Sequence, residues 1–360
     1  MKTKQIPLMG VAAALFLALG IQHSALFGQG SLTPPGPPAP TMKTLAQVEP
    51  RTPISGAPIT ITNPGSYYLA TNLTVSTGDA IVIGTNNVTL DLNGFTISST
   101  AASPTGFAVR VLGGVCNLKV MNGFVSGGVT NSGSIYSGPG FQYGIAFLGL
   151  WPSNVTVSGV HVSGCMADAI NVGVNSYVES CVVQSVGGYG IVASTVKDSR
   201  AVACGQTAIS GSQILNCTGE SVSSGSGIDA STAINSAGYS KYGVGLSAGA
   251  ALNCYGSSQS QGLFARTAQN CSGYGDSAQG LCAQMAVNCY GYSRTSYGVH
   301  ATCAQNCVGY SSSGAGVYAE AIAIACFGCS STGPGIQAYI ANSCRVWCGT
   351  TNITHKYDMP

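Results

Sequence analysis

The chain has 360 residues, of which 45% are hydrophobic and only 7% are charged, and it contains 50 glycines. About a quarter of the residues of an ordinary globular domain are charged, so few side chains remain here for ionic chemistry. The formal net charge of +2 gives no electrostatic footprint for nucleic acid, and we expect no nucleic-acid partner.

The first 30 residues are typical of a signal peptide. Lys2 and Lys4 precede an uncharged apolar run, residues 6–21, which is short for a membrane span. We therefore expect an exported protein, extracellular, at the cell surface or in the periplasm, with no stable membrane insertion after cleavage. An uncleaved membrane anchor is the alternative. Residues 31–53 are rich in proline and predict an extended spacer and lead-in.

Strand patterns begin near residue 59. Residues 59–62 alternate between apolar and polar side chains, and a turn signal follows at residues 63–65. The stretch 64–97 resembles the opening turns of bacterial, secreted, right-handed parallel β-helix repeat proteins, which share the pectate-lyase-like fold. The closing residues 356–360 resemble a tail seen in secreted members. The resemblance implies an all-β parallel helix over 54–350 and a tail over 351–360, but not an activity, because this fold hosts lyases, hydrolases, epimerases, adhesins and binders.

The middle of the chain is less regular. Residues 115–120 and 154–162 both alternate as strands, whereas residues 126–140 between them are rich in glycine and serine and predict a loop. From about residue 169 onward the turns become shorter and repeat one sequence motif, which we call the phrase.

Residues 262–344 repeat this phrase five times, as Gly-(Leu/Val/Ile)-x-Ala-x-x-Ala-x-Asn-Cys-x-Gly with small changes. Helical repeats need about 33 to 47 residues and a 3.6-residue periodicity, and both are absent. Each copy therefore predicts one turn of a single-stranded solenoid, with turns of about 18–21 residues. The Asn, at Asn270 for example, is expected at a left-handed bend. A left-handed hexapeptide coil is disfavoured because the apolar residues do not recur every six positions.

The cysteine of the phrase occupies one slot in successive turns. We expect these residues to point inward and to stack about 4.8 Å apart: Cys217, Cys254, Cys271, Cys289, Cys307, Cys326 and Cys344. Buried free thiols are the favoured interpretation of the 15 cysteines. Local disulfides, Cys326 with Cys329 or Cys344 with Cys348, are the alternative. Zinc is disfavoured because the single CxxC motif has no second copy, and no metal or cofactor is expected.

The 11 acidic residues show no catalytic pattern. Glycoside hydrolysis needs two carboxylates that face one sugar bond, and the adjacent aspartates with nearby His and Arg-x-Lys patterns of the resembled hydrolases are absent. His161 and His300 lie in predicted strands, and we expect neither to have an acidic neighbour. We predict no catalytic residue and favour a non-catalytic protein. A polysaccharide-active lyase or glycoside hydrolase, whose acids converge only in three dimensions, is the alternative.

Regularly spaced aromatic residues indicate a ligand-binding surface. They recur in the outward slots just after the inward cysteine or glycine: Tyr255, Tyr274, Tyr290, Tyr292, Tyr310 and Phe327. The repeat of one turn is close to the length of one pyranose unit, and tyrosine has an apolar face with a polar tip. We therefore predict binding of a polysaccharide or cell-surface glycan, or a scaffold role at the cell surface or envelope. The alternative is that these aromatics only stack on one another and stiffen the coil.

Overall fold

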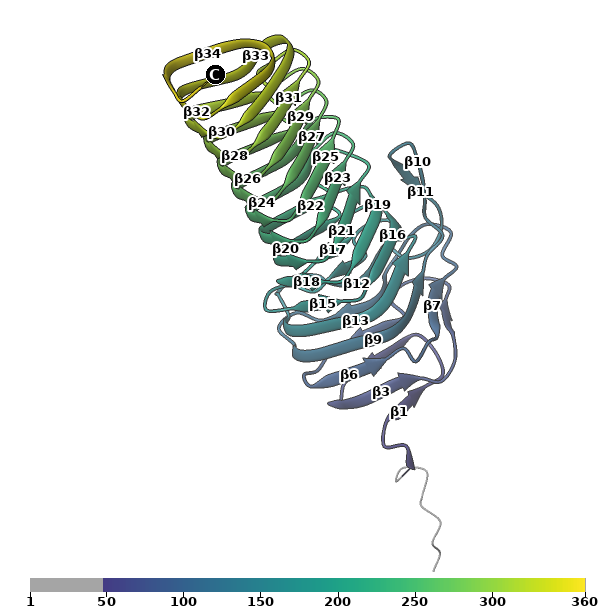
Figure 1. Cartoon of the computed structure of the whole chain (residues 1–360). Helices are drawn as coiled ribbons and strands as arrows, with labels where there is room; N and C mark the ends of the chain where they lie inside the picture. Colours follow the sequence, from purple (N-terminus) through teal and green to yellow (C-terminus); the bar gives the residue numbers. More distant parts are fainter. Residues whose placement is uncertain (1–47, 360) are drawn as a thin grey trace, which may run out of the picture. The chain divides into compact units, whose positions relative to one another are not determined.

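The computed structural model describes residues 48–359, and the chain from Arg51 onward forms one compact unit. In this unit the chain winds into about 17 stacked turns of a right-handed parallel β-helix, which confirms the predicted fold (Figure 1). The expected signal peptide, residues 1–30, and residues 31–47 of the expected spacer lie outside the described residues. Within residues 48–359, no helix is long and apolar enough to cross a membrane.

Each turn contributes to three parallel sheets, which we number in the order in which the repeat enters them. Sheet 1 begins with β2 (Ile59–Ile61), β5 (Ile81–Ile83), β8 (Phe107–Val111), β12 (Tyr143–Phe147), β14 (Ile170–Asn171) and β17 (Ile191–Val192). Sheet 2 begins with β1 (Thr52–Ile54), β3 (Gly65–Leu69), β6 (Val88–Asp91), β15 (Tyr177–Glu179) and β18 (Thr195–Lys197). Longer strands of later turns run through sheets 1 and 2: β20 (Ile209–Leu215), β22 (Ile228–Ile234), β24 (Val244–Leu252), β26 (Gln261–Gln269), β28 (Leu281–Val287), β30 (Val299–Gln305) and β32 (Val317–Ile324).

Sheet 3 follows the bend after sheet 2. It is formed by β4 (Leu73–Val75), β7 (Thr96–Ser99), β16 (Val182–Val186), β19 (Arg200–Cys204), β21 (Thr218–Ser221), β23 (Ala237–Ser240), β25 (Tyr255–Ser258), β27 (Ser272–Gly275), β29 (Tyr290–Ser293) and β31 (Val308–Ser311). The strands β9 (Cys116–Ser126) and β13 (Ser153–Ser163) span sheets 2 and 3. The last strands, β33 (Phe327–Asn342) and β34 (Arg345–Tyr357), begin in sheet 3 and continue through sheets 1 and 2.

Like residues stand in register along the coil. Leu263 pairs with Leu281, and Leu281 pairs with Val299, so these turns advance by 18 residues as expected. The early turns are wider than the predicted 18–21 residues, because Leu118 of β9 pairs with Val155 of β13. Part of that extra chain, in the segment expected to be a loop, forms a small antiparallel hairpin of β10 (Thr130–Ser132) and β11 (Ile135–Ser137).

The core is built from the inward side of each short strand. In one repeat the exposed fractions of Leu263, Ala265, Ala268 and Cys271 are 2% or less. Sheets 1 and 3 approach so closely that a side chain on Gly273 would collide with the backbone of the following turn's first residue. Glycine therefore recurs in this slot because only a residue without Cβ allows the contact.

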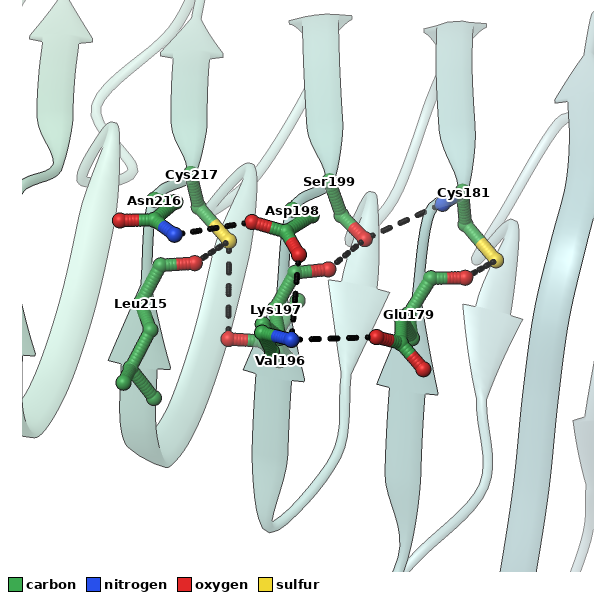
Figure 2. A network of polar contacts seen from close by, with 9 residues as sticks. All are labelled: Glu179, Cys181, Val196, Lys197, Asp198, Ser199, Leu215, Asn216 and Cys217. Carbon is green, nitrogen blue, oxygen red and sulfur yellow. Dashed lines mark hydrogen bonds and ion pairs between the residues drawn. The ribbon is translucent and has the colours of Figure 1, made fainter.

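The bend between sheets 2 and 3 is formed by one residue with positive φ in each turn. Six asparagines hold this position with φ between 49° and 53°: Asn216, Asn235, Asn253, Asn270, Asn288 and Asn306. The expected left-handed conformation of Asn270 is thereby confirmed. Each amide nitrogen also donates a hydrogen bond to the side chain in the same slot one turn earlier, and the series starts at Asp198, which accepts from Asn216 at 2.9 Å (Figure 2). We call this series the asparagine ladder.

Candidate functional site

The structure places all seven cysteines of the expected inward column inside the coil, with exposed fractions of 3% or less. Their thiols donate to nearby backbone carbonyls, as Cys217 does to Leu215 at 3.1 Å. Ser199 occupies the same slot, where its hydroxyl accepts a 3.1 Å hydrogen bond from the amide of Cys181 and donates to Lys197 O (Figure 2). Since serine and cysteine make the same contacts in this slot, the column has a structural role.

One disulfide is present among the described cysteines, and it differs from both local pairs considered above. Cys329 is bonded to Cys348, one turn later, because both point outward from sheet 3 in register. Cys326 and Cys344 instead face the interior as free thiols, so neither can reach its outward neighbour. The other 13 cysteines of the described chain are free; ten of them are buried, as the favoured interpretation expects, whereas Cys116, Cys282 and Cys303 are half-buried.

The acidic side chains mostly hold the coil together. Asp91, which is 8% exposed, accepts hydrogen bonds from Arg51, 3.0 Å away, and from the backbone amide of Asn93. A hydrogen bond from Asn216 lowers the pKa of the Asp198 carboxyl, with a further contribution from Lys197. Within residues 48–359, no group of three or more His, Cys, Asp or Glu side chains is placed to hold a metal ion.

The expected ligand-binding aromatics lie side by side on sheet 3. Tyr255 and Tyr290 project from one slot, while Tyr274, Tyr292 and Tyr310 project from the slot two residues later. We define the tyrosine ladder as these residues together with Tyr239: their ring centroids form a chain of contacts of 5.5 to 5.9 Å. The rings therefore pack on one another, as expected if these aromatics stiffen the coil. Their outer edges remain available for a ligand.

The ladder ends on a residue that the sequence analysis missed. Trp347 lies 5.8 Å from Phe327 and 6.4 Å from Tyr310, between ring centroids. A signal for it was present, because Trp347 follows Cys344 at the same spacing that separates Tyr274 from Cys271. Its 69% exposure makes it the most solvent-accessible aromatic of this face.

A groove of about 450 Å³ runs beside the ladder. The exposed edges of Tyr239 (40%) and Tyr274 (37%) form its apolar part. Its polar part contains the side chains of Glu220, Lys241, Gln259, Asp276 and Ser257. Ser221, Ser240 and Ser258 also line it but are buried, and the hydroxyls of Ser240 and Ser258 donate to backbone carbonyls. Aromatic faces with a few polar groups around them are the usual composition of a site for a polar organic ligand.

Burial and the neighbouring hydroxyls, chiefly that of Tyr274, raise the pKa of Tyr290 to about 12. The Tyr290 hydroxyl therefore stays protonated at neutral pH. A protonated phenol both donates and accepts hydrogen bonds, which matches the hydroxyl groups of a sugar.

The β10–β11 hairpin is fixed beside one end of this groove. The hydroxyl of Ser134 donates a 2.6 Å hydrogen bond to the carbonyl of Val222, which itself lines the groove. The phenol of Tyr136 donates to the carbonyl of Ala203, also at 2.6 Å, and its burial raises the Tyr136 pKa. The hairpin thus limits the groove toward the wider, early turns.

The expectation that His300 has no acidic neighbour is wrong. Its Nε2 atom lies 3.3 Å from Oε1 of Glu320, and its Nδ1 atom lies 3.7 Å from Sγ of Cys282. Glu320 reaches this position because the register shifts between Ala319 and Ile322, where the turn contains one extra residue. His161, the other histidine considered, packs edge-on against Phe124.

No protein-family model matches the sequence, and no curated protein matches it either. Among solved structures, the tailspike protein gp49 of Acinetobacter baumannii bacteriophage Fri1, a capsular polysaccharide depolymerase, matches with 11% sequence identity and a TM-score of 0.32. The match covers 82% of this chain and 57% of the tailspike chain, so this chain spans less than two thirds of that protein. A likeness at this TM-score carries no argument about activity.

Proposed function

We propose that this chain is an exported protein that binds an extended polysaccharide along the tyrosine ladder of sheet 3, without cleaving its glycosidic bonds. The observation that carries the proposal is the unbroken series of ring contacts from Tyr239 to Tyr310 beside a groove lined by the side chains of charged and amide residues: Glu220, Lys241, Gln259 and Asp276. Neighbouring turns are about 4.8 Å apart, so rings recur at a distance close to one pyranose unit. A linear glycan can therefore contact successive turns in the same way.

The spacing of the groove's two carboxylates argues against glycosidic cleavage there. Glu220 pairs with Tyr239 in the next turn, and Tyr274 is two turns beyond Tyr239, just before Asp276. The backbones of Glu220 and Asp276 are therefore about 14 Å apart, at about 4.8 Å per turn. Inverting and retaining glycosidases separate their two carboxyl groups by about 9.5 Å or less. Asp276 also forms an ion pair with Arg294, at 3.7 Å.

Two observations support export and a place at the cell surface or envelope. The basic and apolar N-terminal segment is typical of a signal peptide. The disulfide between Cys329 and Cys348 is of a kind that persists in oxidising compartments outside the cytosol.

A glycan array followed by calorimetric titration with size-graded oligosaccharides tests this function. We expect affinity to rise with oligosaccharide length until the ladder is filled. We also expect Tyr274→Ala to weaken binding about tenfold, which corresponds to about 1.4 kcal/mol. Tyr318→Ala, on sheet 1, is the matched control and should bind as the unmodified protein does. An array without any bound glycan, or an unchanged Kd for Tyr274→Ala, would overturn the proposal, and new reducing ends in the bound polysaccharide would contradict its non-cleaving part.

A further inference from the structure

Three reactive side chains from three successive turns meet on sheet 1, away from the tyrosine ladder. Cys282 lies on β28, His300 on β30 and Glu320 on β32. Cys282 and His300 stand directly opposite each other in the strand register, so their contact follows from the repeat itself. The sulfur is 3.7 Å from Nδ1, and the carboxylate is 3.3 Å from Nε2.

The two contacts use opposite nitrogens of the imidazole. A metal ion bound by all three side chains would be coordinated by one nitrogen of the imidazole, and the thiol and the carboxylate would both have to lie near that nitrogen. They lie near different nitrogens, so this arrangement does not suit a shared metal. It suits proton transfer instead. When Nε2 carries its proton and donates it to Glu320, Nδ1 has a free lone pair that can accept the proton of the Cys282 thiol. A nucleophile, a base and a group that orients the base are then aligned.

Neighbouring side chains fix the base and the carboxylate. The hydroxyl of Thr302 donates a 3.0 Å hydrogen bond to the second carboxylate oxygen of Glu320. The rings of Tyr297 and Tyr318 pack against the imidazole of His300, with centroids 5.4 and 5.0 Å away. Only 21% of the His300 side chain is exposed, so its ring is held in one place by these contacts.

A groove of about 580 Å³ opens beside these residues. Near Cys282 its floor is Gly249 and the backbone of Ala248, Ala265 and Ala283, whose side chains are buried in the core. Phe264, which is 47% exposed, adds an apolar wall, and Arg266 and Gln284 are the side chains with N–H donors beside it. A floor without projecting side chains leaves room for a short acyl chain beside Phe264, and the donors suit a carbonyl oxygen that gains negative charge.

We propose that Cys282, His300 and Glu320 form a site that hydrolyses carboxylic esters with a small acyl group. The Cys282 thiol gives its proton to Nδ1 of His300 as its sulfur bonds to the ester carbonyl carbon. The C–O bond then breaks, and the leaving alkoxide takes that proton and departs as an alcohol. Water, activated by His300, hydrolyses the resulting thioester, which releases the carboxylic acid and restores the thiol. Glu320 acts as a positioning residue.

Burial, with a smaller effect of Glu320, raises the pKa of the Cys282 thiol. The thiol is therefore protonated at neutral pH, and a base is needed in the attacking step. The charged and titratable groups around Cys282 and its base His300 are Glu320, Arg266, Tyr297 and Tyr318.

The test uses 4-nitrophenyl acetate with the full-length protein. We expect a burst of 4-nitrophenol and an acetyl group on the peptide that contains Cys282, identified by mass spectrometry. Cys282→Ala should abolish both. His300→Ala should slow acetylation about 10²-fold, and added imidazole should restore part of the rate because it supplies the missing base.

Cys303 provides the matched control. It lies on β30, and its side chain is half-buried, as that of Cys282 is. Cys303→Ala should keep the burst. Glu320→Gln should lower kcat for acetylation with little change in KM, because the imidazole loses its orientation while the ester keeps its binding site, whereas a purely structural role would change both.

Equal acetylation of the Cys303 and Cys282 peptides, an unchanged burst in Cys282→Ala, or no acetylated protein at all would overturn the proposal. A variant that fails to fold is recognised by its circular dichroism, and Cys282→Ser then replaces Cys282→Ala because Ser247 occupies the same slot two turns earlier. The result is separable from the proposed function, because polysaccharide binding on sheet 3 should be the same in all of these variants.

Discussion

Asn288 donates a 3.2 Å hydrogen bond from its Nδ2 to Oδ1 of Asn270, one turn earlier, and both residues have φ of 53°. The same side chain thus makes the bend between sheets 2 and 3 and ties two neighbouring turns together. Asn306 donates to Asn288 in turn, so each amide is both donor and acceptor. This explains why the repeat keeps Asn in a slot where glycine would satisfy the backbone alone.

Asn288→Ala should lower the free energy of unfolding by about 3 to 4 kcal/mol. A left-handed alanine costs about 1 to 2 kcal/mol, and each of two lost hydrogen bonds contributes about 1 kcal/mol. Urea unfolding followed by circular dichroism measures this change. Asn288→Gly is the matched control: it loses the same hydrogen bonds but tolerates the positive φ, so its loss should be smaller. Equal losses in the two variants would show that the backbone conformation contributes nothing.

Ala325→Asn should raise the urea midpoint. Ala325 already has φ of 48° and interrupts the asparagine ladder after Asn306. The introduced amide relieves the cost of a left-handed alanine and can donate to Oδ1 of Asn306, which together are expected to stabilise the protein by about 1 kcal/mol or more. An unchanged or lower midpoint would mean that the ladder geometry does not continue into this turn.

The repeat predicted the structure of the later turns well, because each position of the repeat has the same structural role in every turn. Cys271 is inward, Asn270 is at the bend and Tyr274 is outward, each as its spacing from the others indicates. The pairing of Cys329 with Cys348 was not predicted, since it depends on which cysteines point outward from sheet 3 and not into the core. Glu320 was also missed: the extra residue in its turn is visible in the sequence, but where the chain accommodates it is decided by packing between turns.

Stability should fall as the pH rises above 9. Burial raises the pKa of Cys165 from 9 to about 12 and that of Cys181 to about 11. Below pH 9 these thiols are protonated in both the folded and the unfolded protein, so their contribution to the free energy of unfolding is fully present. Between pH 9 and about 12 only the unfolded thiols ionise, and each such thiol lowers the unfolding free energy by up to about 1.4 kcal/mol per pH unit.

Urea midpoints measured from pH 7.5 to pH 10.5 check this prediction. Cys165→Ala is the control, because removal of one thiol with a raised pKa should make the decline of the urea midpoint above pH 9 less steep. A decline of the same slope in this variant would contradict the assignment.

Removal of the disulfide should release the last turns of the coil first. Cys329 and Cys348 are separated by 19 residues, and closing a loop of this length is worth about 3 kcal/mol in the chain-entropy treatment. In a solenoid each turn contacts only its neighbours, so the effect should be local. Hydrogen exchange of Cys348→Ser should therefore speed up in β33 and β34 while β26 is unaffected. Uniform acceleration, or none, would count against this.

The most direct measurement of polysaccharide binding by sheet 3 is hydroxyl-radical footprinting with and without a bound glycan. We predict that the glycan slows oxidation of Tyr239, Tyr274 and Trp347, which are exposed along one face. Tyr339, which is 55% exposed and lies on β33 outside the tyrosine ladder, should oxidise at the same rate in both samples. Protection of Tyr339 without protection of Tyr274 would contradict polysaccharide binding by sheet 3, because the glycan would then bind on a different face.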